Sequence, residues 1–389
     1  MTLPPLPFEA KPPRRLHQPS AEEFWSRAFE EPLVLTGCME DWRLLRELRA
    51  SDTFARKLGV LGPLFGEKPV TFHQMPRRTE GHYHFQKDRL EGRTFGQPAR
   101  DVPFDVFARQ LLRSLEGGSD DYVYLQSHLV EQGTPLRESL GPRILPFLKE
   151  QQAFPRMWIG SNGQVVNLHY DDFVNFICMV EGTKRVTLFA PELLPSMYHA
   201  PFDDMLEQAQ ASHVRLLEPD LERFPRFREA LREARVAVVN PGEVLYIPPM
   251  WWHHVESFGL NVMVNNWVFE EHFDLVVQMQ ENLTRAIRLF IHHPSEQRAR
   301  ELEHYRRTVF APGVASTPKP AEDGNPLARH RAETRELVAR MPDFLRRQVA
   351  LYYEHFVFQV SGDPIPSQPG AFAAMVERKA RVASFFARE

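Results

Sequence analysis

Apolar and polar residues alternate along the middle of the chain in a pattern that is typical of short β-strands. Between about residues 155 and 270, apolar residues recur at every second position, and turn-forming residues separate the runs. Glu181-Gly182 is expected to make a tight connection between two strands. Short antiparallel strands at this spacing favour a sandwich or barrel, of which the jelly roll is one form. The runs that we interpret as strands are Val165–Asp171, Val174–Val180, Lys184–Phe189, Val236–Val239, Val244–Ile247, His253–Phe258 and Asn261–Val268.

The segment before this region combines strand and helix patterns. Residues 1–19 are rich in proline and are expected to form an extended arm. A helix should follow, because Ser20 is suited to cap its N-terminus and Glu23 lies three residues further on. The other patterns are helical at about 102–115 and strand-like at Glu31–Gly37, Lys68–Phe72 and Tyr122–Gln126.

After about residue 270 the pattern becomes helical. Residues spaced by three or four, almost all of them apolar, continue from Phe273 to Phe290. Proline and glycine mark residues 311–327 as a linker, and further helices are expected near 331–358 and 369–387. We therefore expect a mainly β protein with α additions, divided into an arm at 1–19, a domain at 20–270 and a helical region at 271–389.

The composition is that of a globular protein without a strong charge field. Of the 389 residues, 43% are hydrophobic and 25% are charged, which allows a sizeable core. The formal net charge is −4, and the arginine-rich stretches lie among glutamates in helical patterns, as on solvated helix faces. Binding to nucleic acid is therefore not expected.

Cysteine usage and the N-terminus bear on the compartment. Cys38 and Cys178 both lie in apolar surroundings, so buried reduced thiols are favoured over a disulfide, which suits a reducing compartment. Met1–Pro5 lacks the basic start of a signal peptide, and no apolar run is long enough to span a bilayer. We expect a cytoplasmic protein without a membrane segment.

His169 and Asp171 lie two residues apart on a predicted strand, so both side chains leave the same face. At the rise of a strand their Cα atoms are roughly 6–7 Å apart, close enough to bind one ion. A histidine from a distant strand would complete a set that suits iron(II) and leaves positions open for co-substrate and oxygen. His253 and His254 compete for this place, and the pattern leaves the choice open. A polar surface pair is the alternative interpretation of His169 and Asp171.

A buried cation would suit a dicarboxylate co-substrate. 2-Oxoglutarate chelates iron through its 2-oxo and 1-carboxylate groups, and its far carboxylate needs a positive partner. Lys184 and Arg185 are adjacent on a predicted strand, so only one can face inward, and two exposed charges are the alternative. Asn175 stands among apolar neighbours, and Asn265 and Trp267 share one face of a later strand.

Ordered blocks from about Trp158 to Trp267 resemble those of the JmjC or cupin-8 oxygenases. The chain is particularly similar to the asparaginyl hydroxylase that inhibits hypoxia-inducible factor and to its bacterial relatives. The resemblance covers most of residues 20–270 and implies a double-stranded β-helix core with N-terminal α/β elements and a C-terminal helical extension. The matching blocks are His169–Asp171, Asn175, Glu181–Phe189, Glu222–Pro225, Pro241–Pro248, Trp251–Ser257 and Asn265–Trp267, with Pro32–Gly37, Asp41-Trp42 and Tyr124–Gln126 upstream.

The resemblance implies which residues bind the metal ion and the far end of the co-substrate. Iron(II) would be bound by His169, Asp171 and His253, the first histidine of its pair. The distal carboxylate of 2-oxoglutarate would contact Lys184 and Tyr124.

The resemblance also implies the walls of the reaction pocket. Asn175 and Asn265 would lie near the chelating end of 2-oxoglutarate. Gln126 and Trp267 would line the pocket where the substrate side chain meets the iron. One position departs from the family, because Val166 stands where these enzymes often have a threonine that contacts the co-substrate.

The resemblance implies an Fe(II)- and 2-oxoglutarate-dependent dioxygenase that uses O2 to hydroxylate a side chain of a peptide or protein. A hydroxylase of a small molecule or tRNA base, or an N-methyl-lysine demethylase, would use the same iron site. A non-enzymatic cupin-like binding module would be expected to have lost a ligand. The family also implies a homodimer formed through the C-terminal helices, with packing of these helices on the barrel as the alternative.

Overall fold

The structure is a computed structural model that divides into two compact units. The first unit comprises Met1–Phe189, Arg215–Glu218 and Leu231–Phe269, and the second comprises Ala190–Val214, Pro219–Ala230 and Glu270–Glu389. The residues that the structure describes are 3–28, 30–77, 99–141, 153–171, 174–199, 210–268, 273–290, 292–311 and 325–359.

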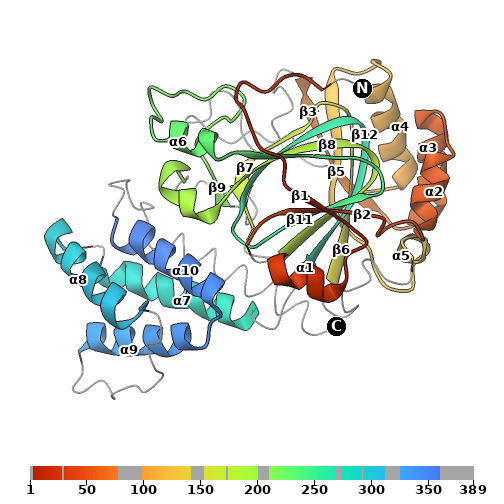
Figure 1. The fold of residues 1–389 in the computed structure, drawn as a ribbon. Helices are drawn as coiled ribbons and strands as arrows, with labels where there is room; N and C mark the ends of the chain where they lie inside the picture. The colour runs from red at the N-terminus through yellow and green to blue at the C-terminus, as the bar shows by residue number, and fades with distance from the viewer. Residues whose placement is uncertain are drawn as a thin grey trace. The chain divides into compact units, whose positions relative to one another are not determined.

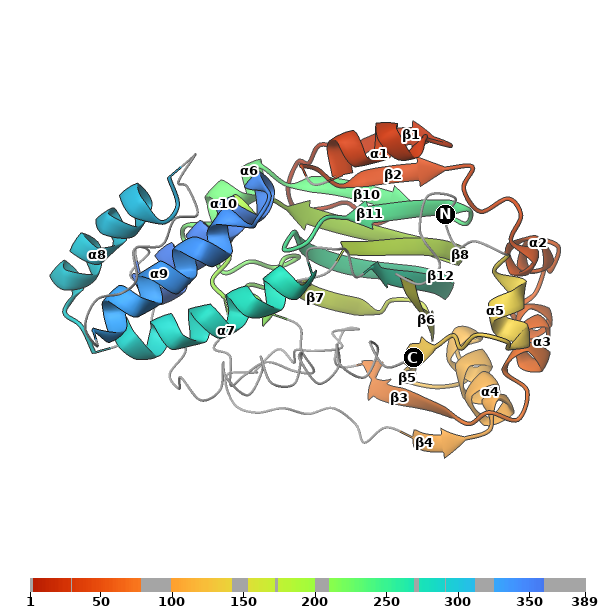
Figure 2. The same ribbon diagram turned by 90° about the horizontal axis from the view of Figure 1, so that it is seen from below.

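Antiparallel β-structure dominates the first unit (Figures 1 and 2). Off the main path of its sheet, β10 (Arg235–Val239) pairs with β8, and β7 (Val165–Tyr170) pairs with β12. Of the strand pairs described in this unit, only β1 with β2 is parallel. The predicted mainly β fold with a double-stranded β-helix core is confirmed. The main path runs through β1 (Arg14–His17), β2 (Leu33–Thr36), β11 (Glu243–Ile247), β8 (Val174–Phe189), β12 (Trp252–Val268), β6 (Ala153–Gly160), β5 (Asp121–Leu129), β3 (Val70–Pro76) and β4 (Ala99–Val102).

The predicted tight connection at Glu181-Gly182 is wrong, because β8 continues through it. Glu181 pairs with Val262 of β12, and the next pair on the other side of Gly182 joins Thr183 to Phe258. Gly182 has φ 77°, and a Cβ atom there would lie 2.2 Å from the Leu260 carbonyl oxygen, so only glycine fits. The chain therefore bends at this glycine without leaving the sheet, and the two strands predicted on either side are the two halves of β8.

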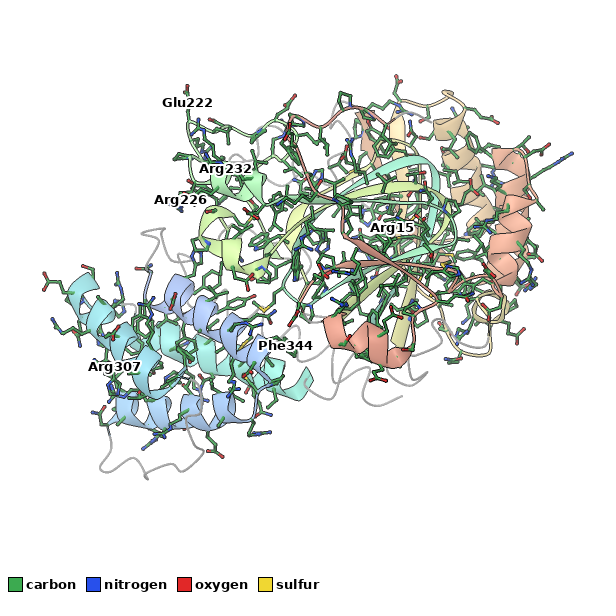
Figure 3. All side chains as sticks on the ribbon, viewed as in Figure 1. Arg15, Glu222, Arg226, Arg232, Arg307 and Phe344 are labelled. Carbon is green, nitrogen blue, oxygen red and sulfur yellow. The ribbon has the colours of Figure 1, made fainter. Side chains whose placement is uncertain are left out.

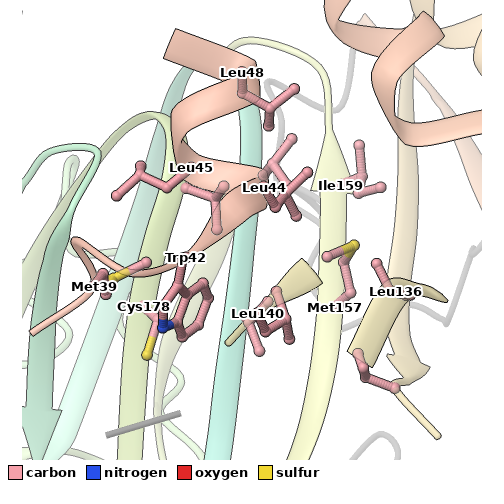
Figure 4. Close-up of a cluster of buried hydrophobic side chains, with 14 of the residues drawn as sticks. Met39, Trp42, Leu44, Leu45, Leu48, Leu136, Leu140, Met157, Ile159 and Cys178 are labelled. Carbon is pink, nitrogen blue, oxygen red and sulfur yellow. The ribbon is translucent and has the colours of Figure 1, made fainter. Parts of the chain in front are cut away.

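The helices of the first unit pack an apolar face against the sheet. Leu44, Leu45 and Leu48 of α2 belong to one buried cluster with Trp42 and with Cys178 of β8 (Figure 4). Burying each leucine contributes about 1.5–3 kcal/mol to folding. The helix predicted at about 102–115 is confirmed as α4. These helices are α1 (Ala21–Ala28), α2 (Arg43–Arg49), α3 (Phe54–Phe65), α4 (Phe104–Leu115) and α5 (Pro135–Ser139).

The N-terminal arm is extended and hydrogen bonded to the first unit. Strand β1 pairs with β2, and Arg15 of β1, labelled in Figure 3, forms an ion pair with Glu243. The helix cap that follows is confirmed, since the backbone N–H of Glu23 donates to Ser20 Oγ at 3.1 Å.

The second unit is mainly helical in its described residues. Strand β9 (Gln210–Ala211), the 3₁₀-helix η4 (Pro191–Ser196) and most of α6 (Phe227–Arg232) belong to it. On α8, Arg307 forms an exposed ion pair with Glu303, as expected of a solvated helix face (Figure 3). Its other helices are α7 (Phe273–Phe290), α8 (Ser295–Thr308), α9 (Pro326–Ala339), α10 (Asp343–Tyr352) and the π-helix η6 (Tyr353–Val357).

The helix boundaries near the C-terminus differ from the prediction. The helix expected at 331–358 is divided into α9 and α10, because Pro342 occupies the N-cap of α10. The side chain of Asn325 accepts hydrogen bonds from the backbone of Leu327 and Ala328, so α9 begins within the predicted linker. The rest of that linker, residues 312–324, and the helix predicted at 369–387 lie outside the described residues.

Two predictions from composition can be compared with the structure. Cys38 and Cys178 are both buried and free, as expected of reduced thiols. Within the described residues, no helix combines the length and the apolar character that crossing a membrane requires.

Candidate metal centre

Three side chains with metal-binding atoms meet where β7 and β12 lie side by side. His169 on β7 pairs with His253 near the start of β12, and Asp171 follows the last residue of β7. One ligand atom from each residue lies within 4.8 Å of the other two. The ring centroids of the histidines are 4.0 Å apart, and His253 Nε2 is 3.7 Å from Asp171 Oδ2. The structure thus brings together the three residues for which the sequence implies iron ligation.

Backbone carbonyls orient both imidazoles. His169 Nδ1 lies 2.6 Å from the Asn167 carbonyl oxygen, and His253 Nδ1 lies 2.9 Å from that of Trp251. A carbonyl oxygen only accepts, so each Nδ1 carries the hydrogen and donates it. Nε2 is then the nitrogen that can bind a metal ion in both residues.

The electrostatics of the three residues suit a metal ion. Burial lowers the pKa of His253 to about 4, and His169 acts in the same direction while Asp171 opposes it. Near neutral pH His253 is therefore uncharged, and its Nε2 lone pair is available. Two imidazole nitrogens and a carboxylate, without a thiolate, are the donor set that suits non-haem iron(II). The residues present therefore fit the metal ion that the sequence implies.

His254 lies on the other face of β12. It is buried and stands opposite Thr187 of β8, whereas His253 stands opposite His169. Of the two histidines between which the sequence pattern leaves the choice open, the structure therefore brings His253 to the other two ligands.

A turn before β12 holds the segment that contains Asp171. The backbone N–H of Met250 donates to the Asp171 carbonyl oxygen at 2.7 Å, and that of Trp251 donates to Pro248 at 3.4 Å. Met250 has φ 66°, a left-handed conformation that is uncommon outside glycine and costs free energy at a methionine. The hydrogen bond from Met250 thus joins the backbone of Asp171 to the segment that leads to His253.

A chain of hydrogen bonds leads from β6 to Asp171. The indole Nε1 of Trp158 donates to Asn265 Oδ1 at 2.6 Å. Asn265 Nδ2 donates to Asn175 Oδ1 at 3.4 Å, and Asn175 Nδ2 donates to Asp171 Oδ2 at 3.3 Å. The two asparagines expected near the co-substrate therefore contact each other, and one of them contacts the candidate metal ligand Asp171.

Lys184 is a buried cation with a neutral partner. It is 1% exposed, and its Nζ donates to Ser257 Oγ at 2.8 Å. Among the described residues no carboxylate forms an ion pair with it. Burial lowers the pKa of Lys184 to about 7. An anion that entered this place would meet a positive charge that no carboxylate of the described residues compensates.

The neighbouring Arg185 is also buried, but its charge is compensated. Its Nε and a terminal nitrogen donate to both carboxylate oxygens of Glu256, at 2.7 and 2.6 Å. A further nitrogen donates to the carbonyl oxygen of Pro4 in the N-terminal arm. Neither Lys184 nor Arg185 is the exposed strand charge that the alternative interpretation requires.

Two of the remaining predicted pocket residues, Tyr124 and Trp267, lie beside Trp158. The Tyr124 and Trp267 rings have their centroids 5.8 and 6.4 Å from that of Trp158. Burial raises the pKa of Tyr124 above its usual range, so its phenol stays protonated. Gln126 Oε1 is buried and has no hydrogen-bond partner among the described residues. Val166 stands opposite Val255 of β12, so this pair supplies no hydroxyl group.

Comparison with known proteins identifies the family. Residues 20–275 match the cupin-like domain. The chain belongs to the cupin-like domain family. The family that the resemblance implies is therefore confirmed, and the candidate ligands lie within the matched part of the cupin-like domain.

The proteins to which this chain is similar include HSPB1-associated protein 1 and lysine-specific demethylases. HSPB1-associated protein 1 of Homo sapiens is 35% identical over 171 residues, which cover 43% of this chain and 34% of that protein. Lysine-specific demethylase 8 of Xenopus tropicalis is 26% identical over 273 residues, which cover 69% of this chain and 55% of that protein. Lysine-specific demethylase JMJ31 of Arabidopsis thaliana is 36% identical over 110 residues, which cover 28% of this chain and 20% of that protein. The chain thus spans about a third to a half of the length of the first two.

Three residues of the cupin-like domain site were missed by the sequence analysis. Trp158 begins the hydrogen-bond chain, Ser257 accepts from the buried lysine, and Met250 holds the Asp171 loop. The sequence contained a signal for Ser257, because it lies four residues after His253 and side chains at even spacing project from the same face of a strand. For Trp158 and Met250 the relevant atoms are an indole N–H and a backbone N–H, whose partners only the folded chain defines.

Proposed function

We propose that this protein is an Fe(II)- and 2-oxoglutarate-dependent dioxygenase that hydroxylates a side chain of a peptide or protein. The observation that carries the proposal is the combination, in one barrel, of the His169–Asp171–His253 cluster with the buried, uncompensated Lys184. A metal site alone would fit many functions, and a cation alone would fit any anion. Together they provide the two attachment points of 2-oxoglutarate.

The metal site supplies the reactive chemistry. Iron(II), when bound, allows O2 and 2-oxoglutarate to react, with succinate and carbon dioxide as products and an oxygen atom transferred to the substrate. His169 and His253 present their Nε2 atoms because their Nδ1 atoms donate to backbone carbonyls. Asp171 supplies the negative charge, and Asn175 holds one of its oxygens.

The second attachment point is the distal carboxylate of the co-substrate. Lys184 would bind it as the charged ammonium, with Ser257 keeping the Nζ group in place. The protonated phenol of Tyr124 is suited to donate a further hydrogen bond. Asn175 and Asn265 would lie near the chelating end, where Asn175 contacts Asp171.

The substrate pocket would be lined by Gln126 and Trp267. The buried, unpartnered Oε1 of Gln126 can accept a hydrogen bond from an amide of a substrate, which suits a peptide or an amide side chain. A relative named HSPB1-associated protein 1 is in keeping with a protein partner. Relatives named lysine-specific demethylases support N-methyl-lysine demethylation as a second candidate.

The test is turnover by metal-free protein that is reconstituted with iron(II). We expect 2-oxoglutarate to be converted to succinate slowly without substrate, and peptides from a proteome extract to gain the mass of one oxygen atom. Loss of methyl groups from methylated lysine peptides would favour the second candidate. Absence of both turnover and metal-dependent 2-oxoglutarate binding would contradict the proposed function.

Matched variants test the third ligand. His253→Ala should abolish turnover, and His254→Ala should retain it if the protein folds, because His254 faces away from the cluster. Circular dichroism and the melting temperature report folding. Retained turnover in His253→Ala with loss in His254→Ala would move the third ligand by one residue.

We also propose that the C-terminal helices pair two subunits. Light scattering should then give the mass of a homodimer for the full chain. A chain that ends after residue 359 serves as a comparison, because it keeps the described C-terminal helices. A monomeric full chain would contradict the pairing.

A further inference from the structure

Three adjacent strands carry the hydrogen-bond chain that ends on Asp171. Trp158 is on β6, Asn265 on β12 and Asn175 on β8, and these strands are neighbours in the sheet. The two asparagines are buried, with exposures of 5% and 2%. Asn265 pairs with Arg156 of β6, and Trp158 is two residues further along that strand, so the indole reaches Asn265 diagonally.

The indole at one end of this chain and the carboxylate at the other give it the same direction. An indole N–H donates and cannot accept, so Asn265 must present its oxygen to Trp158 and its nitrogen to Asn175. Asn175 must then present its oxygen to Asn265 and its nitrogen to Asp171. If either amide turned over, two N–H groups or two oxygens would face each other in a buried place. Leaving such a group unsatisfied costs about 1–3 kcal/mol.

The last bond of the chain restrains the most mobile ligand. Each imidazole is held by a backbone carbonyl, whereas the carboxylate of Asp171 can rotate about its side-chain bonds. The Asn175 N–H group lies 3.3 Å from Oδ2, the oxygen that is 3.7 Å from His253 Nε2. The carboxylate is thereby held in the orientation in which it faces the two histidines.

We propose that Trp158 is a positioning residue of the metal centre, whose indole N–H sets the orientation of Asn265 and Asn175 and through them holds Asp171 ready to bind the metal ion. The inference rests on the proposed function, because it assumes that a metal ion binds at Asp171. Trp158 also packs against Tyr124 and Trp267, so the test must separate its N–H group from its ring.

The experiment measures the affinity of the metal-free full chain for Mn(II), without 2-oxoglutarate, by electron paramagnetic resonance. Trp158→Phe keeps an aromatic ring and removes the N–H group. Changing a direct partner of a metal ligand weakens binding about 10–100-fold, so for this more distant group we expect roughly a 10-fold loss. The melting temperature shows whether the variant is folded.

A double-mutant cycle tests whether Trp158 acts through the amide chain. Asn265→Leu alone should weaken Mn(II) binding, and adding Trp158→Phe to it should change the affinity less than about twofold, because the chain is already broken. Asn265→Asp provides the same test if Trp158→Phe does not fold. The carboxylate can still accept from the indole, but it has no N–H group for Asn175, so Mn(II) binding should weaken.

The outcomes separate this inference from the proposed function. Folded Trp158→Phe with the Mn(II) affinity of the wild type would overturn it, and so would a Trp158→Phe effect of full size in the Asn265→Leu background. If Trp158→Phe does not fold and Asn265→Asp is measured instead, an Mn(II) affinity equal to that of the wild type would also overturn the inference. A wild-type protein that binds Mn(II) but, when loaded with iron(II), neither binds nor converts 2-oxoglutarate would contradict the proposed function and leave the positioning role intact. A wild type that does not bind Mn(II) would overturn both.

Discussion

Two buried polar clusters, one in each unit of this protein, satisfy their side chains differently. In the second unit, Tyr305, His330 and Tyr353 lie with Asn282 and Thr334 in a closed network. His330 Nε2 donates to the Asn282 carbonyl at 3.0 Å, so its Nδ1 accepts from the Tyr305 hydroxyl at 2.8 Å. The Thr334 and Tyr353 hydroxyl groups both reach Asn282 Oδ1.

The first unit leaves polar capacity unused. Lys184 has a serine where a buried cation would need an anion, Gln126 Oε1 has no partner among the described residues, and two imidazole nitrogens face a carboxylate. A buried network whose members satisfy one another rigidifies a fold, whereas unmet capacity in a buried place awaits a ligand. By this criterion the cluster in the second unit is structural, and the cluster in the first unit has the capacity to bind a ligand.

Removing the cation should have the largest effect. Lys184→Met should weaken 2-oxoglutarate binding by about 100-fold or more, since the loss of a buried charge partner costs about 2–5 kcal/mol. The free energy of unfolding should stay the same or rise, because methionine fills the space without a buried charge. Calorimetry with Mn(II)-loaded protein and urea unfolding measure the two quantities. Unweakened binding, or a large loss of stability, would place Lys184 among the structural residues.

The closed network should give the opposite result. Asn282→Ala removes the shared acceptor and should destabilise the second unit by about 1–3 kcal/mol, because the buried Tyr353 hydroxyl loses its closest acceptor while the Thr334 hydroxyl can still donate to the His330 carbonyl. Mn(II) and 2-oxoglutarate affinities should not change. Hydrogen exchange in α7 and α9 reports the loss. A variant that instead lost metal binding would erase the contrast between the two units.

Co-substrate binding should depend on pH through Lys184. Its pKa is about 7 in the free protein, and a bound carboxylate favours the charged form. Binding above this pH must take up a proton, so affinity should fall up to about 10-fold per pH unit above pH 7. Calorimetry in buffers of different ionisation enthalpy measures the proton uptake. Affinity that stays constant to pH 9 would show that Lys184 is not the partner.

The smallest expected effect is the pH dependence of the second unit. Burial lowers the pKa of His330 from 6.5, so the unfolded chain binds its proton more readily than the folded protein does. The stability that neutral His330 contributes is present above pH 6.5 and is lost as the pH falls through the lowered value. The melting temperature should therefore fall on acidification, and His330→Gln should reduce this slope. Equal slopes in both proteins would count against the closed network as its source.

The sequence predicted the parts of the site that depend on strand periodicity. His169 and Asp171 were expected to share a face because they are two residues apart, and their ligand atoms do lie close together, although β7 ends at Tyr170. The same reasoning could not choose between His253 and His254, because alternation states that they face opposite ways but not which face is the interior. The strand pairing between His253 and His169 supplies that information.

Long-range contacts explain what the sequence did not predict. Glu181-Gly182 has the composition of a turn, but pairing with β12 on both sides keeps it in the sheet. Asn175 and Asn265 could be assigned to the pocket, but their common direction depends on Trp158 of another strand. The divided helix near residue 342 is different, since Pro342 was a local signal against one continuous helix.

The placement of so much of the site on β12 makes its register decisive. His253 and Ser257 project from one face of this strand, and His254 and Glu256 project from the other. A slip of one residue would exchange these faces together. In one direction, the slip would place Glu256 opposite Lys184 in the position of Ser257, and the glutamate would then neutralise the lysine. The same slip would move His253 away from His169 and Asp171. Deletion of Ser257, with the pairing of the rest of β12 kept, should therefore abolish metal and co-substrate binding in one step, even in a chain that still folds.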